Sequence, residues 1–253
     1  MQVTYLSQPS PPGLTNDDFV IASNSFVIVL DGATAAPHID TGCIHDVPWL
    51  VAHLGTELST ILTTQPSISL TEALASSIQS VYDSHVNTCD LANPDSPSTT
   101  VTVLRERLQD DTIDYLVLSD SAIILETYDG HILPIIDDRT QHLPSYTLEA
   151  IRQLRNNPAG FWVAGTRPDA ATYAITASQP RSNIRRAALL TDGASRLVER
   201  YGKSWKELLD ILDNDGPGHL IKLVREQESQ TPNGKYRGKK FDDATAAICR
   251  LDR

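Results

Sequence analysis

The chain has 253 residues, which is enough for one large domain or two small ones. Its 32 acidic and 21 basic residues give a formal net charge of −11, and this balance argues against a nucleic acid or an anionic membrane surface as the main partner. No apolar stretch reaches the roughly 18–20 residues that span a bilayer, and residues 1–12 lack the features of a signal peptide, so we expect a cytoplasmic protein.

Apolar, β-branched runs predict strands that come in adjacent pairs along the chain. Asn24 and Ser25 separate the first two runs, which is the spacing of a hairpin. In chain order, the predicted strands are residues 18–23, 26–30, 99–105, 113–119, 122–127, 132–136, 172–177, 184–191 and 244–250. A flap is expected between Tyr128 and Ala171, before the strand at 172–177.

Apolar residues at helical spacing predict two consecutive helices between the second and third strands. Their apolar faces consist of Leu50, Leu54, Leu58 and Ile61 in the first helix, and of Leu74, Ile78, Val81 and Tyr82 in the second. Ser69 with Glu72 predicts a capping box for the second helix, and Ser204 with Glu207 predicts one for a later helix.

Paired strands interrupted by consecutive helices indicate an α+β fold rather than alternating βαβ units. We therefore expect one domain, residues 1–253, built as a four-layer α-β-β-α sandwich of two antiparallel sheets flanked by helices.

Acidic residues lie where several of the predicted strands begin or end, each beside a small or turn-forming residue. The sites are, in order, Asn16-Asp17-Asp18, Asp31-Gly32, Ser119-Asp120-Ser121, Thr191-Asp192-Gly193 and Asp242-Asp243. One Asp-Gly pair is usually only a turn. Five acidic sites in one chain predict more, because hard divalent cations take carboxylate oxygens and keep several waters. Two such ions can share a carboxylate and activate a water for attack on phosphorus.

In order, spacing and strand context, these motifs resemble the motif series of type 2C metal-dependent serine/threonine protein phosphatases, most of all the bacterial branch. Ser98-Thr99-Thr100 and Ala244-Thr245 belong to the same series, and the resemblance extends over nearly the whole chain. It implies that phosphorylated proteins are the substrates. It also implies that a water bridging two Mg²⁺ or Mn²⁺ ions hydrolyses the phosphoester without a phosphoenzyme.

The resemblance further implies a role for each acidic site. Asp31 would bridge the two metals, while the carbonyl of Gly32 and the carboxylate of Asp17 would serve one ion. Asp192 and Asp242 would serve the other ion, so that Asp31, Asp192 and Asp242 are the expected catalytic residues.

Five further residues of the series have supporting roles under the same resemblance. Asp120, together with Asp192, matches a weaker third metal position of some bacterial members. Asp18 would not contact the ions but would orient their ligands or waters. Thr191, Gly193 and Thr245 would be structural.

Two positions depart from the family pattern. Gly13 stands where many members place an arginine that binds the substrate phosphate, and Ala33 stands where some have a histidine that donates a proton to the leaving group. Either a flap arginine such as Arg139 or Arg167 takes over phosphate binding, or the metals hold the phosphate alone. We favour the second alternative. His38 and His45 are the candidate replacements for this proton donor, and a loop or cap role is the simpler expectation for both.

The remaining patterns do not predict a further metal site or a disulfide. His38, Cys43 and His45 lack a fourth ligand at the spacing of a zinc site. The three cysteines, Cys43, Cys89 and Cys249, are irregularly spaced and are expected to be reduced, buried thiols. Residues 213–216 are expected to form a turn between helices rather than a calcium loop, because the acidic residue at the twelfth loop position is missing.

Two alternative functions stay open at this point. The missing arginine favours a catalytically weak relative that serves as a binding or signalling module. A phosphatase of a non-protein phosphoester on the same fold is the other alternative. The retained aspartates favour catalysis, because a pure binding module has no need for all of them. The sequence gives no indication of the oligomeric state.

Overall fold

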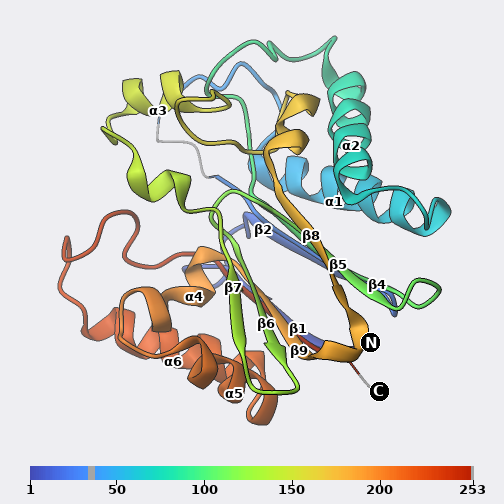
Figure 1. Ribbon diagram of the computed structural model, residues 1–253. Coiled ribbons are helices and arrows are strands. Elements are labelled where there is room, and N and C mark those ends of the chain that lie inside the picture. Colours follow the sequence, from blue (N-terminus) through green and yellow to red (C-terminus); the bar gives the residue numbers. More distant parts are fainter. Residues whose placement is uncertain (34–37, 252–253) are drawn as a thin grey trace.

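Two five-stranded antiparallel sheets stack face to face and carry helices on their outer sides (Figure 1). The computed structural model describes residues 1–33 and 38–251. One sheet has the strand order β1-β10-β9-β6-β7, and the other has the order β2-β3-β4-β5-β8. The predicted α+β fold, a four-layer α-β-β-α sandwich, is confirmed.

The strands and helices fall into two halves with one connecting flap. The first sheet contains β1 (Gln2–Gln8), β10 (Ala244–Arg250), β9 (Ile184–Leu190), β6 (Ala122–Thr127) and β7 (Ile132–Ile135). The second contains β2 (Asp18–Ala22), β3 (Phe26–Asp31), β4 (Val101–Arg107), β5 (Thr112–Leu118) and β8 (Ile175–Pro180). Helices α4 (Asp192–Glu199), α5 (Trp205–Asn214) and α6 (Pro217–Gln230) cover the first sheet, and α1 (Val47–Thr64) and α2 (Leu70–His85) cover the second. The flap between β7 and β8 holds η1 (Asp138–His142), α3 (Leu148–Leu154) and η2 (Pro168–Tyr173), and η3 (Arg181–Asn183) joins β8 to β9.

Strand β3 shows why the central strands are apolar throughout. Side chains alternate between the two faces of a strand, and here both faces are covered. Val27 and Val29 pack between the sheets, whereas Ile28 and Leu30 pack against the helical layer of α1 and α2. Each such buried aliphatic side chain contributes about 1.5–3 kcal/mol relative to exposure. The sandwich is therefore held by three apolar layers rather than one.

The helix starts that the sequence marks are confirmed. Ser69 and Ser204 each cap a helix in a complete capping box, with Glu72 and Glu207 as the reciprocal partners. Of the predicted turn at residues 213–216, only Asp215 and Gly216 join α5 to α6, because α5 continues to Asn214. Gly216 has a φ of 84°, which glycine adopts without strain.

Some predicted bounds are wrong. The run at 172–177 was expected to be one strand, but η2 continues to Tyr173 and β8 begins only at Ile175. Strand β1 was not predicted, because its side chains are mostly exposed and its pairing partner is the distant β10. Helices α3, α4 and α6 were also missed.

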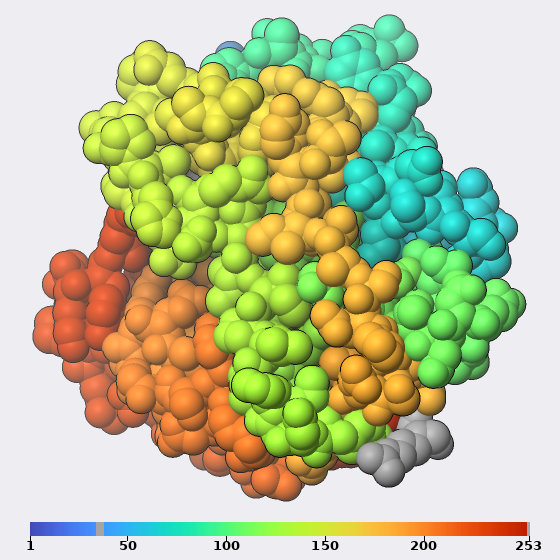
Figure 2. Space-filling view, in the orientation of Figure 1, coloured from blue at the N-terminus to red at the C-terminus, as the bar shows by residue number. Residues whose placement is uncertain are grey.

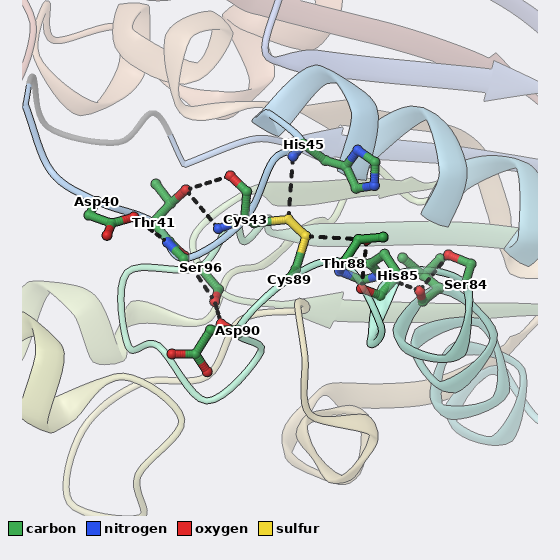
Figure 3. The surroundings of a disulfide bond; sticks show 12 residues. Asp40, Thr41, Cys43, His45, Ser84, His85, Thr88, Cys89, Asp90 and Ser96 are labelled. Carbon is green, nitrogen blue, oxygen red and sulfur yellow. Dashed lines mark hydrogen bonds between the residues drawn. A yellow bond between two sulfur atoms is a disulfide. The ribbon is translucent and has the colours of Figure 1, made fainter.

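The expectation of three reduced cysteines is wrong for two of them. Cys43, before α1, and Cys89, after α2, form a disulfide with their Cα atoms 4.4 Å apart (Figure 3). They are separated by 46 positions in the sequence, so no local pattern indicates the pair. Cys249 is a free thiol in the core between the sheets, and burial raises its pKa to about 12.

Candidate metal centre

The strand-end aspartates meet at one end of the sandwich. Asp18 and Asp31 lie opposite each other at the paired ends of β2 and β3 in the second sheet. Asp192 begins α4 directly after β9 of the first sheet, and the amide of Asp192 donates to Oδ2 of Asp31 at 3.2 Å. The two sheets therefore bring the backbone of Asp192 into contact with the carboxylate of Asp31, 161 positions away in the sequence.

Asp18 lies behind this group and joins the two sheets. Its Oδ2 accepts hydrogen bonds from the hydroxyls of Thr191 at 3.0 Å and Thr245 at 2.8 Å. Its side chain is buried, and removal from water raises its pKa to about 8, although the two hydroxyls lower it. Thr191 and Thr245 also pair through their backbones, because the Thr191 amide donates to the Thr245 carbonyl at 3.0 Å. The sequence placed these threonines near the site but did not show that one carboxylate links both.

Asp31 is at the centre of the acidic group. Removal from water raises its pKa well above the ordinary value of 3.8, and the charges of Asp18, Asp192, Asp120 and Asp242 raise it further. Burial and the charge of Asp242 likewise raise the pKa of Asp192 from 3.8 to about 7, against the opposing effect of the Arg196 guanidinium.

Asp242 and Asp120 occupy the outer side of the group. Asp242 is paired with two cations, Arg196 at 3.0 Å and Lys239 at 3.1 Å. Asp120 accepts hydrogen bonds from Ser119 at 3.2 Å and from Thr140 of the flap at 3.0 Å. The side chain of Thr140 thereby attaches the flap to the acidic group.

Close backbone contacts position Asp17 and the loops around it. The Gly32 amide donates to the Asp17 carbonyl at 3.1 Å, and a Cβ on Gly32 would lie 2.4 Å from that oxygen and 2.2 Å from Val47. Only glycine fits at position 32. The same holds for Gly193, where a Cβ would lie 1.8 Å from the carbonyl oxygen of Asp243.

Asp243 is a positioning residue that the sequence analysis did not single out. Its carboxylate accepts hydrogen bonds from the amides of Asp17 and Ser10, both at 2.7 Å, and its side chain is buried. It therefore fixes the amino-terminal segment against the loop that carries Asp242 and leads into β10. The adjacent pair Asp242-Asp243 was the available signal, but only the contacts distinguish the two.

The acidic group fits hard divalent cations that keep part of their water shell. Several carboxylates with raised pKa values share one end of the sandwich, and Mg²⁺ or Mn²⁺ compensates such charge through oxygen ligands. Within residues 1–33 and 38–251, no three histidine, cysteine or acidic side chains are already assembled as a ligand set. Ions with few direct protein ligands and several waters agree with both observations.

The flap arginines that were considered as phosphate ligands are engaged elsewhere. Arg139 forms an ion pair with Asp137 and donates to the Tyr173 carbonyl at 2.8 Å. Arg167 pairs with Asp169 and lies over the ring of Trp162 at 5.4 Å.

Neither candidate proton donor is shown to take that role. His45 stacks on the Trp49 ring at 3.9 Å, and His38 has a φ of 68° in the loop before α1. Cys43 is bonded to Cys89, so it is not available as a thiolate ligand for a zinc ion beside these histidines.

The flap also contacts the loop before β10. The guanidinium of Arg237 lies 3.4 Å from the ring centroid of Tyr146, and the space-filling view shows the yellow-green flap reaching the red loop (Figure 2).

Comparisons with known proteins agree with this geometry. The family model described as "Protein phosphatase 2C" matches residues 12–225. No curated protein sequence matches the chain.

Solved structures with the same fold include bacterial phosphatases. The serine/threonine phosphatase PstP/Ppp of Mycobacterium tuberculosis has a TM-score of 0.67 at 18% identity, covering 100% of this chain and 99% of that one. Stp1 of Staphylococcus aureus has a TM-score of 0.65 at 13% identity, covering 100% and 96%. A catalytic domain of PstP in complex with 2 manganese ions has a TM-score of 0.62 at 17% identity, covering 98% and 96%. At these identities, the structures establish the fold.

Proposed function

Because the chain belongs to the protein phosphatase 2C family, we propose that it hydrolyses phosphoserine and phosphothreonine esters of proteins with Mg²⁺ or Mn²⁺ as cofactor. The observation that supports this most directly is the meeting of Asp31 and Asp192 across the two sheets, with the pKa values of both carboxyl groups raised. A group of carboxylates with a purely structural role would gain nothing from this mutual repulsion. A metal site gains affinity for a cation from it, because the bound ion relieves the repulsion.

We assign the metal ligands as the resemblance implied. Asp31 would be shared by two ions, Asp17 and the carbonyl of Gly32 would hold one, and Asp192 and Asp242 would hold the other. When bound, the metals supply an activated water and neutralise the charge that develops on the phosphoryl group. Asp120 belongs to a third position, which the contact with Thr140 ties to the flap.

The remaining polar residues of the site hold these ligands in place. Asp18 fixes the ends of β9 and β10 through its two threonine hydroxyls. Asp243 fixes the backbone of Asp17, and Arg196 with Lys239 orients Asp242. Such outer contacts typically affect metal affinity or activity by about 10–100-fold when they are removed.

A catalytically weak binding module is the second candidate, and Gly13 is the observation that favours it. A chain without the amino-terminal arginine has one cationic contact fewer for a phosphate dianion. Activity on a non-protein phosphoester is the third candidate, and only substrate profiling separates it from the first.

A cytoplasmic location and a role in signalling are further proposals. The described residues contain no helix that is both long and apolar enough to cross a membrane. The Cys43–Cys89 disulfide weighs against a reducing compartment, where such bonds are rare. Trapping of free thiols in intact cells tests this: a reduced pair supports the cytoplasm, and an oxidised pair contradicts it.

Hydrolysis of p-nitrophenyl phosphate tests the proposed function. Activity is expected with added Mn²⁺ or Mg²⁺, and it should disappear with EDTA and return when metal is restored. Full activity in EDTA would overturn the metal-dependent mechanism. Absence of any hydrolysis of p-nitrophenyl phosphate or of phosphoserine and phosphothreonine peptides, with a metal-stabilised fold, would favour the binding module.

A further inference from the structure

A cavity of ≈ 630 Å³ opens beside the acidic group. Asp17 and Ala33 line it on the side of the metal centre, the start of α1 contributes Val47, and the flap contributes Ile151 and Arg155. The cavity is therefore bounded by the catalytic end of the sandwich, by α1 and by the flap. Its size is within the range of pockets that bind small molecules or peptide side chains, about 300–1,000 Å³.

Arg155 is the only lysine or arginine among the described residues that line this cavity. It follows α3 directly, and a bridge to Phe161 fixes its backbone. Its Nη1 donates to the carbonyls of Pro94 at 3.1 Å and Ser96 at 3.2 Å. The guanidinium thus has a defined position on the wall of the cavity.

The opposite edge of the Arg155 guanidinium has no acceptor within the part of the chain that the structure describes. Its Nε is buried without a hydrogen-bond partner. Asp95, whose charge acts on the Arg155 guanidinium, forms its ion pair with Arg152 instead. The neighbouring Arg152 differs, because its Nε donates to both oxygens of Asp95 at 2.8 and 3.0 Å. A buried donor without an acceptor is costly, so this edge is suited to an acceptor that arrives with a ligand.

The chemistry of that edge specifies the ligand. Nε and Nη2 of an arginine present two parallel N–H groups, which match two oxygens of a phosphate or a carboxylate. We propose that this cavity is the substrate pocket and that Arg155 binds an oxyanion of the phosphopeptide, supplying the cationic contact that is missing at Gly13. The inference rests on the proposed phosphatase function. The oxyanion is either the phosphoryl group that is cleaved or a carboxylate that flanks it in the substrate.

Substrates of different charge distinguish these two sources. We would compare the wild type, Arg155→Met and Arg155→Lys on p-nitrophenyl phosphate, on a phosphothreonine peptide with neutral neighbours and on the same peptide with acidic neighbours. If Arg155 contacts the reacting phosphoryl group, KM for all three rises at least tenfold in Arg155→Met. If it contacts a flanking carboxylate, KM rises only for the acidic peptide. Arg152→Met, in α3 three positions before Arg155 and outside the lining of this cavity, is the matched control and should stay within threefold.

A second readout separates binding from a structural role, since Nη1 also holds residues 94–96. In Arg155→Ala, added methylguanidinium should restore at least part of the lost kcat/KM, and the thermal transition with Mn²⁺ should not change on its addition. If Arg155→Met does not fold, Arg155→Lys carries the test, with the same rise in KM expected. Unchanged KM values in a folded Arg155→Met or Arg155→Lys, with an active wild type, would overturn the inference. An inactive wild type would instead contradict the proposed function.

Discussion

Replacing Asp192 by asparagine is expected to stabilise the metal-free protein while it removes activity. Burial and the charge of Asp242 raise the pKa of Asp192 from 3.8 to about 7, despite Arg196. A pKa unit corresponds to about 1.4 kcal/mol, so keeping this carboxylate ionised in the folded chain costs up to roughly 4 kcal/mol. This is an upper bound, because neighbouring carboxylates titrate with it.

The sign of the pH dependence follows from proton binding. The folded chain keeps the proton on Asp192 up to about pH 7, whereas the unfolded chain releases it near pH 3.8. The folded state therefore binds more protons between these values, and the free energy of unfolding falls as the pH rises through this window. The variant should match the wild type near pH 4 and exceed it most near pH 8, because asparagine has no such proton.

Urea denaturation in the presence of chelator, followed by tryptophan fluorescence across this pH range, measures the effect. Asp46→Asn is the matched control, since Asp46 caps α1 outside the acidic group and asparagine caps a helix equally well. With saturating Mn²⁺ the order should invert, because a ligand that binds only the folded state stabilises it. A stability difference between variant and wild type that does not change from pH 4 to pH 8 would refute the reasoning.

The remaining predictions concern activity and the disulfide. Asp31→Asn should fold, as judged by circular dichroism, and lose well over tenfold in kcat, since each factor of ten is about 1.4 kcal/mol of transition-state stabilisation. Arg139→Ala and Arg167→Ala should each keep kcat/KM within about threefold, because both guanidiniums are paired inside the flap, and a hundredfold loss would contradict this. Cys43→Ser should lower the free energy of unfolding by up to about 4 kcal/mol, the chain-entropy value for the 46-position separation from Cys89, with an equal effect of reductant on the wild type. An unfolding midpoint that does not respond to reductant would contradict the disulfide.

Local signals were sufficient for the helices and strands that they mark. The capping box of Ser69 with Glu72 involves residues three positions apart, and its hydrogen bonds form whatever the rest of the chain does. Strand β1 and the disulfide depend on distant partners instead. Gln2 pairs with Arg250, and Cys43 bonds to Cys89, so the segments around them carry no pattern of their own. Helix α6 was missed for a related reason, since much of its surface is polar and its apolar residues pack only against α4, α5 and the first sheet.

The candidate site was predictable to the level of strand ends but not of contacts. The Asp-Gly pairs and the order of the motifs pointed to Asp31 and Asp192, while nothing local indicates that Asp18 accepts from both Thr191 and Thr245. That arrangement forms only when both sheets are in place, because Asp18 belongs to β2 of one sheet and Thr245 to β10 of the other. Likewise, the role of Asp243 follows only from two amides more than 220 positions away.

The choice among the flap arginines could not be made from the sequence either. Arg139, Arg152, Arg155 and Arg167 have equal charge and similar surroundings in the chain, and what distinguishes them is which ones already have a carboxylate. Carboxylates of the flap hold Arg139 and Arg167, and Asp95, outside the flap, holds Arg152. Two backbone carbonyls hold Arg155 against residues 94–96. The flap also carries Thr140, which donates to Asp120. A displacement of the flap as one body would therefore alter the oxyanion contact and the Asp120 contact together, so that substrate affinity and affinity at the third metal position would be linked reciprocally.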